Sequence, residues 1–439
     1  MRPLKILITN NGLADRAGSE LYVRDLALAL LKRGHTPIAY STVLGEVAAE
    51  LRAGTVPVVE NLDQLSVAPD IIHGQHHLET MTALLCFPGV PAVYFCHGWL
   101  PWEEAPPKFP RILRYVAVDH TCRDRLLFEH GIPDDRVRVL LNFVDLDRFP
   151  NRTPLPAHPE RALVFSNSIA ESQVANIRAA CQQAGIEIDV LGNHSGNMTG
   201  TPEDVLGGYD LVFAKGRAAL EAMAVGAAVI LCDQIGCGPM VTSDQFDRLR
   251  ALNFGIRTLV SKAVTADAIA RQVSQYDPRD AAKVSARIRG EAALEDAVES
   301  VEALYRETIS EFEAAGRSDA DAEIRAAAGY LRWISPWLKN GTVLQAERDQ
   351  ALVNLDRMQC ELNQNQQEQS LVEERLSQPL ESRDRIQAEL DRIRGDRDLI
   401  QAKLDAIVTS RGWRLLSRYG AIKHRFVIPA LQRLRTPKP

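Results

Sequence analysis

The chain has 439 residues, a formal net charge of −6 and 46% hydrophobic residues. This length suits two large domains with an additional segment, and the hydrophobic content is enough to bury their cores. No stretch approaches the roughly 20 apolar residues that a membrane-crossing helix needs, and the N-terminal apolar run is too short for a secretory signal, so we expect a cytoplasmic protein. The seven cysteines form no Cys-x-x-Cys pair, which favours reduced thiols.

The N-terminus has the pattern of a strand, a polar loop and an amphipathic helix. The apolar run Leu4 to Thr9 suits the first strand of a parallel sheet, and a glycine-containing loop follows it. Ser19 is placed to cap a helix that runs through Arg33 and ends at Gly34. In open α/β sheets, ligands bind at the carboxyl ends of the strands, so this loop is a candidate binding position.

A second unit of this kind contains one carboxylate inside a small, apolar helix. Residues 209–213 suit a short buried strand, and Lys215-Gly216-Arg217 lies where the helix begins. Backbone N–H groups at a helix start attract phosphate, and the two cations add to that attraction. Glu221, about one turn further along, is placed to accept hydrogen bonds from sugar hydroxyls. The alternative is an ordinary strand–turn–helix in which Glu221 is solvated.

Four motifs in this order resemble the retaining family-4 glycosyltransferases. They are AGSELYVRDLALALLKRGH from Ala17, FCHG from Phe95, NFVDLDRF from Asn142 and ALEAMAVGAAVI from Ala219. The resemblance implies an α/β protein of the GT-B fold, in which two Rossmann-like domains face each other across a cleft. It also implies that the second domain holds a nucleotide-sugar donor and the first holds the acceptor.

The resemblance assigns roles to individual residues. Gly18 matches the glycine that lets the first loop approach the donor diphosphate, and His97 matches the histidine that faces the sugar near the reaction centre. Glu221 matches the second glutamate of a pair and would bind the ribose. Phe213 stands where the first glutamate of that pair is expected, which leaves the donor sugar and catalytic competence open.

A second departure lies in residues 163–172, where the family offers an arginine and a lysine to the diphosphate. Neither is present, so we infer from charge balance that Lys215 and Arg217 neutralise the leaving diphosphate. Ser166 and Asn167 lie in this segment and are candidate cleft residues.

The domain boundary is expected after residue 150. Asn142 and Asp145 begin and end a turn that resembles the family's Asn-Gly-Val-Asp turn, with Phe143 in place of the glycine, and they are further candidates for the cleft between the domains. A proline-rich connection follows. The predicted parts are an N-terminal acceptor-side domain at 1–150, a nucleotide-sugar domain with a closing helix at 151–316, a helical linker at 317–345, a coiled coil at 346–408 and a basic amphipathic tail at 409–439.

The coiled coil is predicted from apolar residues that repeat in steps of four and three. Its clearest seam skips one position, at Arg397, and Pro379 predicts a break. The seam would pair with a second copy of the chain or with a partner helix. The alternative is a single helix rich in ion pairs. The seam residues are Ile386, Leu390, Ile393, Ile400, Leu404 and Ile407.

Residues 409–439 contain eight Lys and Arg residues and no Asp or Glu. Interleaved aromatic and aliphatic residues favour an interfacial helix attracted to anionic lipid. The segment that begins SRGWR at Ser410 also resembles the tails of many bacterial polysaccharide glycosyltransferases. Packing onto the catalytic module is the alternative, and nucleic acid is an unlikely partner because no nucleic-acid-binding fold is recognisable.

Together these observations predict a glycosyltransferase that extends a surface polysaccharide or lipid-linked glycan with retention of configuration. It would lie in the cytoplasm, peripherally at the inner face of the cell membrane. The histidines of HGQHH (residues 73–77) are expected in the loop that follows a strand at 70–72. No cofactor is expected, and no metal, because these histidines have no carboxylate or cysteine at a matching spacing. The alternatives are an inactive GT-B scaffold that acts through its coiled coil and tail, and a nucleotide-sugar epimerase.

Overall fold

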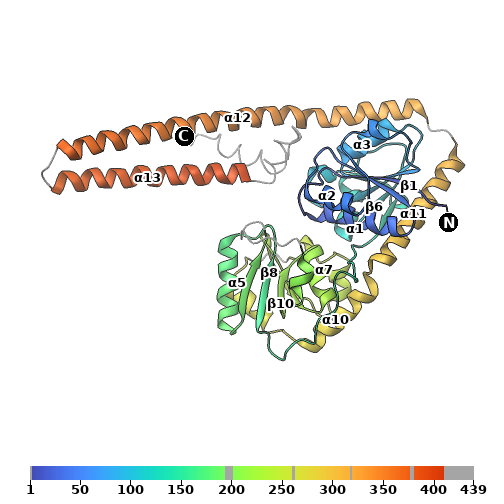
Figure 1. Cartoon of the computed structure of the whole chain (residues 1–439), viewed down its shortest axis with the longest axis horizontal. Helices are drawn as coiled ribbons and strands as arrows, with labels where there is room; N and C mark the ends of the chain where they lie inside the picture. The colour runs from blue at the N-terminus through green and yellow to red at the C-terminus, as the bar shows by residue number, and fades with distance from the viewer. Residues whose placement is uncertain (1, 193–200, 260–262, 317–318, 376–379, 410–439) are drawn as a thin grey trace. The chain divides into compact units, whose positions relative to one another are not determined.

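The computed structural model describes residues 2–192, 201–259, 263–316, 319–375 and 380–409. They belong to two compact units (Figure 1). The first ends at Glu323, and the second begins at Ile324. The first unit contains two sheets with their helices, and the second consists of long helices.

The first sheet has seven parallel strands in the order β3-β2-β1-β4-β5-β6-β7. The helices between its strands include α1, which covers the sheet with a buried apolar face. The predicted first strand and helix are confirmed, although Ala17 occupies the cap position and the Ser19 hydroxyl donates to Glu20 instead. The elements are β1 Lys5–Thr9, α1 Gly18–Lys32, β2 Thr36–Tyr40, α2 Glu46–Ala53, β3 Val58–Val59, η1 Leu62–Gln64, β4 Ile71–Gln75, α3 His77–Cys86, β5 Ala92–Cys96, η2 Trp102–Glu104, β6 Ile112–Ala117, α4 His120–Asp124, η3 Arg125–Glu129, η4 Asp134–Arg136 and β7 Val137–Val139.

The second sheet has five strands in the order β12-β11-β10-β8-β9, and only β12 runs antiparallel to its neighbour. The predicted strand–turn–helix is confirmed as β10 and α7, with Lys215 at the cap position of α7. The predicted α/β class is confirmed as well. The elements are β8 Arg161–Phe165, α5 Glu171–Gln183, β9 Glu187–Leu191, α6 Pro202–Leu206, β10 Leu211–Ala214, α7 Gly216–Val225, β11 Ala228–Asp233, β12 Gly236–Met240, α8 Phe246–Arg250, η5 Ile256–Thr258, α9 Ala266–Val273 and α10 Pro278–Glu291.

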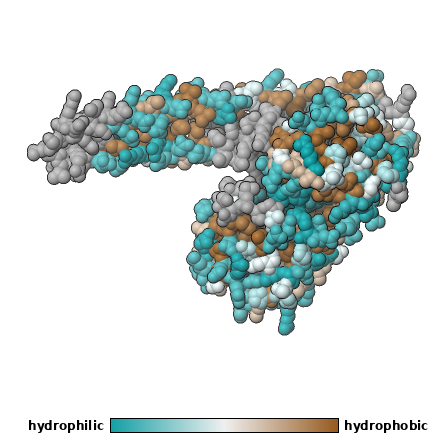
Figure 2. Space-filling view, viewed as in Figure 1, coloured by the Kyte–Doolittle hydropathy of each residue, from teal (hydrophilic) through white to brown (hydrophobic). Residues whose placement is uncertain are grey.

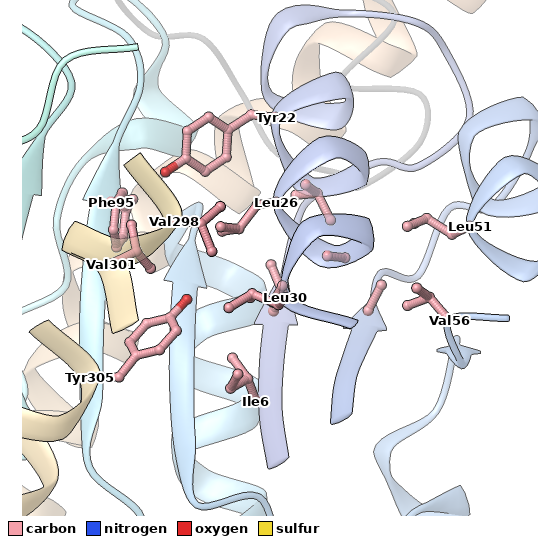
Figure 3. Packing of buried hydrophobic residues seen from close by; sticks show 14 of the residues in the cluster. Ile6, Tyr22, Leu26, Leu30, Leu51, Val56, Phe95, Val298, Val301 and Tyr305 are labelled. Atoms are coloured by element: carbon pink, nitrogen blue, oxygen red, sulfur yellow. The ribbon is translucent and has the colours of Figure 1, made fainter. Parts of the chain in front are cut away.

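Helix α11, Leu294–Ala315, follows the second sheet in sequence but packs on the first. Its contacts are with α1, β5 and β6, and the Tyr305 hydroxyl lies 2.6 Å from His73 Nδ1 on β4. The predicted domain at 151–316 includes this helix, which follows the second sheet in sequence, whereas its apolar contacts are with the first sheet. The reason is an apolar row on α11 that continues the core of the first sheet (Figure 3); the row comprises Val298, Val301, Leu304 and Tyr305.

The second unit contains the helices α12, Ala320–Arg375, and α13, Leu380–Thr409. Helix α12 runs without interruption through the predicted boundary at 345 and includes Pro336. The two helices lie side by side and antiparallel (Figure 1), and Pro379 lies between them, outside the described residues. In α13 the seam positions from 386 to 404 are partly buried, whereas the residues between them are exposed.

We predict that Tyr305→Phe lowers the free energy of unfolding by about 1–3 kcal/mol, because it leaves the buried His73 Nδ1 without its hydroxyl partner. Urea unfolding measures this change. The control is Glu299→Gln on the exposed side of the same helix, which we expect to stay within about 0.5 kcal/mol of the parent. Equal stability of Tyr305→Phe and the control would contradict the account of how α11 is held.

Candidate active site

Polar side chains meet at the carboxyl ends of β8, β10 and β11. The Lys215 ammonium pairs with Asp233, whose Oδ1 also accepts hydrogen bonds from the Ser168 hydroxyl at 2.5 Å and the Ser166 hydroxyl at 3.1 Å. Asp233 is fully buried. Burial by itself raises the pKa of Asp233, but the Lys215 charge and the serine hydroxyl outweigh burial and lower it. The candidate Ser166 therefore lies in this cluster, while Asn167 is exposed beside it.

Arg217 lies between two carboxylates, one on a helix that packs on the first sheet and one on a helix that packs on the second. Its Nε donates to Glu221 Oε1 at 2.7 Å on α7, and its Nη2 pairs with Asp25 on α1. Both carboxylates are buried. Burial raises the pKa of Glu221 more than Arg217 lowers it, whereas Arg217 and Arg24 together hold the pKa of Asp25 below its usual value despite burial. This triad of Asp25, Arg217 and Glu221 joins the two halves of the first unit.

The triad belongs to a larger network of charges. Arg148 lies 3.7 Å from Asp25 and makes two hydrogen bonds, of 2.9 and 2.7 Å, to Glu203. Arg24 pairs with Asp25 at 2.7 Å and with Glu50 at 2.9 Å. Each arginine in this network therefore faces at least one carboxylate, so the positive charge at this position is already balanced.

The two candidate glycines begin helices α1 and α7. A Cβ added at Gly18 would meet nothing within 4 Å, so the space beside the start of α1 is open. Gly216 has a φ of +57°, which favours glycine, and its N–H donates to the Phe254 carbonyl at 2.9 Å. One backbone donor at the start of α7 is thus already used, and phosphate binding there remains a prediction.

His97 lies directly after β5, at the carboxyl end of the first sheet. Its backbone N–H donates to Glu104 Oε2 at 2.8 Å, and its ring contacts the ring of Tyr22 edge-on, with 4.5 Å between the centroids. Burial lowers the pKa of His97 to about 4, although the Glu104 carboxylate acts in the opposite direction. The imidazole is therefore neutral near pH 7.

Three buried polar atoms at this edge have no hydrogen-bond partner among the described residues. They are Asn10 Oδ1 after β1, Gln75 Oε1 at the end of β4 and His97 Nε2 after β5. These three strands are neighbours in the sheet, so their carboxyl ends lie together. Leaving a buried polar atom unpaired costs about 1–3 kcal/mol, so the edge has hydrogen-bonding capacity that a polar ligand would satisfy.

The histidines of HGQHH do not all lie in the loop that the sequence predicted. His73 lies inside β4, where its ring stacks on Phe95 with 3.9 Å between centroids, while His76 caps α3 and His77 begins it. His76 Nε2 lies 3.5 Å from Glu104 Oε1. Within the described ranges, no group of three His, Cys, Asp or Glu residues is arranged to hold a metal ion.

Asn142 and Asp145 serve the connection between the sheets. The Asn142 N–H donates to Asn253 Oδ1 at 3.2 Å, and Asp145 Oδ1 accepts from the N–H groups of Asp147 and Arg148 at 3.1 and 3.2 Å. Asp145 and Asp147 also have an Asp-x-Asp spacing that the expectation of no metal overlooked. In the structure Asp145 caps a turn instead. Phe143, which stands in place of the family's glycine, is buried against Tyr22 with 4.9 Å between the ring centroids.

Phe213, which replaces the first glutamate of the pair, is fully buried inside β10. Its side chain belongs to a core cluster with Val164 and Ile230 of the neighbouring strands. A glutamate at this position would lie in an apolar core, so the departure from the family pattern is part of how this strand packs.

Sequence reasoning missed Asp25 and Asp233. Asp233 directly follows the apolar run Ala228 to Cys232, which is the same signal that drew attention to Lys215 after β10. Asp25 lies within the recognised motif from Ala17, but its importance depends on Arg217, which is 192 positions away in sequence. No local pattern identifies that pairing.

Comparisons with known proteins agree with this arrangement. Residues 16–148 match the family described as Glycosyltransferase Family 4. A glycosyltransferase from Rickettsia africae ESF-5 has a similar structure, with 15% sequence identity and a TM-score of 0.52, over 70% of this chain and 99% of that one. Anabaena HepE, in complex with UDP and glucose, has 13% identity and a TM-score of 0.50, over 69% of this chain and 99% of that one. A comparison with curated proteins found no match. The predicted GT-B fold is thereby confirmed.

We predict that Arg217→Ala lowers the free energy of unfolding by about 3–5 kcal/mol, because it leaves the buried Glu221 without its ion-pair partner and removes the bond between Asp25 and α7. Urea unfolding measures the loss. Arg123→Ala removes a more exposed ion pair with Asp134 and serves as the control, with an expected loss within about 1 kcal/mol. Similar losses in the two variants would show that the triad does not hold the halves together.

A second prediction concerns the protonation of His97. Its pKa of about 4 in the folded state lies below the ordinary value of 6.5, so the unfolded chain binds the extra proton between these values and the contribution of His97 to stability rises with pH there. Nitrogen-15 NMR titration of histidine-labelled protein should show a neutral ring from pH 5.5 to 8. A titration midpoint near 6.5 would contradict the buried position of the ring.

Proposed function

We propose that the protein is a glycosyltransferase that moves a sugar from a nucleotide-sugar donor to a growing surface polysaccharide or lipid-linked glycan, with retention of configuration. The observation that supports this most directly is the meeting of charged and unpaired polar groups at the carboxyl edges of both sheets in a GT-B fold. Open α/β sheets bind ligands at this edge. The match of residues 16–148 to family-4 glycosyltransferases supports the same chemistry.

On the donor side, we assign the diphosphate to Lys215 rather than to both cations. A diphosphate needs positive charge as its bond to the sugar breaks, yet Lys215 and Arg217 are both paired with carboxylates. The Lys215 side chain is 33% exposed and that of Arg217 is 13% exposed. Lys215 can therefore exchange Asp233 for phosphate at lower cost, while Arg217 keeps Glu221 oriented toward the ribose.

On the acceptor side, we assign the positioning of sugar hydroxyls to His97, Asn10 and Gln75. The unpaired atoms of these side chains offer hydrogen bonds at one edge, and His97, with a pKa of about 4, is too weak a base to keep the transferred proton near pH 7. In the proposed step the bond from the anomeric carbon to the leaving phosphate breaks, and a bond to the acceptor oxygen forms on the same face. The acceptor proton passes to the leaving phosphate oxygen, so the chain needs to supply position and charge rather than a nucleophile.

The proposal includes the location and the partners of the chain. We place the protein in the cytoplasm, at the inner face of the membrane. The segment 346–408 already forms an antiparallel pair of helices within one chain (Figure 1), and we propose that this pair associates with a second copy or a partner helix. The basic tail at 409–439 that would contact anionic lipid lies, apart from Thr409, outside the described residues. None of the described helices is long and apolar enough to cross a membrane. No metal is required in this proposal, and transfer that persists with excess EDTA tests that part.

A non-catalytic scaffold is the second candidate, and one observation favours it. The family's first glutamate is replaced by the buried Phe213, and both candidate cations are already paired. A scaffold would keep the fold and the helical unit without binding a donor.

Donor binding distinguishes the two candidates. We predict that one nucleotide series among UDP-, GDP-, ADP-, CMP- and dTDP-sugars raises the unfolding temperature of the parent, because a ligand at 100 times its dissociation constant adds about 2.7 kcal/mol of stability. Glu221→Gln should weaken that binding at least about tenfold, through loss of a charge-assisted hydrogen bond.

The control for this experiment is Glu187→Gln, an exposed carboxylate at the amino end of β9, on the opposite edge of the same sheet. It should bind the donor as the parent does. If no nucleotide-sugar series raises the unfolding temperature of the folded parent protein, the scaffold is favoured. Nucleotide release that depends on an added glycan acceptor would establish transfer.

A further inference from the structure

The first part of α12, residues 324–343, presents apolar side chains to solvent. Ile324 is 67% exposed, Leu331 is 63% exposed and Leu338 is 40% exposed. These residues are seven positions apart, which is about two turns, so they form one row along the helix. Ile334, about 60° around the same helix from Leu331, is buried. The exposed row is therefore one side of an apolar stripe, and Ile334 is the buried part of that stripe.

A row of cations lies directly beside the apolar row. Arg325, Arg332 and Lys339 each follow one of the three aliphatic residues, so they repeat with the same spacing. All three are exposed. No Asp or Glu occurs from 324 to 346, and acidic residues resume at Glu347. The exposed side of this segment, which we call the α12 face, therefore combines an aliphatic row and a purely basic row.

This pattern is not that of an ordinary solvated helix. A helix in water usually buries its apolar stripe and exposes its charges, whereas here Ile334 is buried but three other aliphatic residues of the stripe are 40–67% exposed beside the charges. Figure 2 shows that hydrophobic side chains reach the surface in the helical unit among hydrophilic ones. Exposed aliphatic side chains that are arranged in a row with charges of one sign indicate a surface that is covered by something of the opposite charge.

We propose that the α12 face docks on an anionic lipid surface, with the helix lying flat on it. The residues from Ile324 to Leu338 span about 21 Å, and both rows run parallel to the helix axis, so each row can lie at one depth along its whole length. The aliphatic row enters the acyl boundary and the cations contact lipid phosphates. A second copy fits less well, because pairing two α12 faces would bring Arg332 and Lys339 of each copy near the cations of the other.

This face is separate from the basic tail at 409–439 and does not depend on the proposed glycosyl transfer. The α12 face nevertheless bears on glycosyl transfer, because it begins directly after the first unit ends at Glu323. A catalytic unit followed at once by a membrane-docked helix would work on acceptors at the bilayer surface.

The test is co-sedimentation of the full chain with vesicles of phosphatidylcholine and phosphatidylglycerol in equal parts, and with vesicles of phosphatidylcholine alone. The parent should bind the anionic vesicles. Arg332→Gln/Lys339→Gln should bind them about thirtyfold more weakly, since each cation near such a surface contributes about 1 kcal/mol. Leu331→Ser/Leu338→Ser should weaken binding at least as much, by removing two inserted side chains.

The matched control is Val353→Ser/Met358→Ser, two exposed apolar residues further along α12, which should bind as the parent does. Free energies of binding from independent contacts add, so both α12-face variants should weaken lipid binding by these factors even if the basic tail also binds lipid. Unchanged binding of both α12-face variants, equal loss in the control, or no binding of the parent would overturn the proposal. So would conversion of an oligomer to a monomer by Leu331→Ser/Leu338→Ser without loss of lipid binding, because the face would then be a self-association surface.

Discussion

The guanidinium of Arg217, held between Asp25 and Glu221, is the interaction on which the candidate site depends. A cation in a buried position is tolerated only where carboxylates meet it with good geometry, and here one carboxylate comes from each half of the first unit. The pairing therefore fixes the start of α7 against α1. It also explains why Glu221 can be buried in an otherwise apolar helix, because the opposite charge of Arg217 offsets part of the cost of burying the carboxylate.

Helix α11 ties the same two halves by different means. It leaves the second sheet and buries an apolar row in the core of the first, and the bond between Tyr305 and His73 connects it to β4. Because His73 stacks on Phe95, and Phe95 precedes His97 by two residues, the packing of α11 extends to the edge where the unpaired polar atoms lie. Helix α11, which comes late in the sequence of the first unit, thus supports the carboxyl edge of the first sheet, where the unpaired polar atoms lie.

Much of this arrangement follows from local sequence signals. The alternation of apolar strands with amphipathic helices predicts a parallel α/β fold, and parallel strands bring their carboxyl ends to one edge. Lys215, Gly216 and Arg217 were predictable at the start of α7 for that reason. The strand from Leu4 to Thr9 was predictable because its apolar residues are continuous.

Other features depend on contacts between distant residues, and the sequence does not contain them in any local form. The pairing of Arg217 with Asp25 exists only once the two halves meet, so charge balance in sequence suggested two free cations where the structure has two ion pairs. The packing of α11 on the first sheet was not predictable for the same reason, since its apolar row fits either sheet until the fold is known. His73 was assigned to a loop because polar residues follow it, although β4 continues through Gln75.

The central claim is that Lys215 exchanges its carboxylate for the donor's diphosphate while Arg217 remains in place. A crystal structure of the protein with the nucleoside diphosphate that stabilises it would test this directly. The account predicts that Lys215 Nζ contacts the phosphate and has left Asp233, and that Arg217 still bridges Asp25 and Glu221. A nucleotide bound away from the carboxyl edge of the second sheet, or an Arg217 that has left Asp25 to bind the diphosphate, would contradict it.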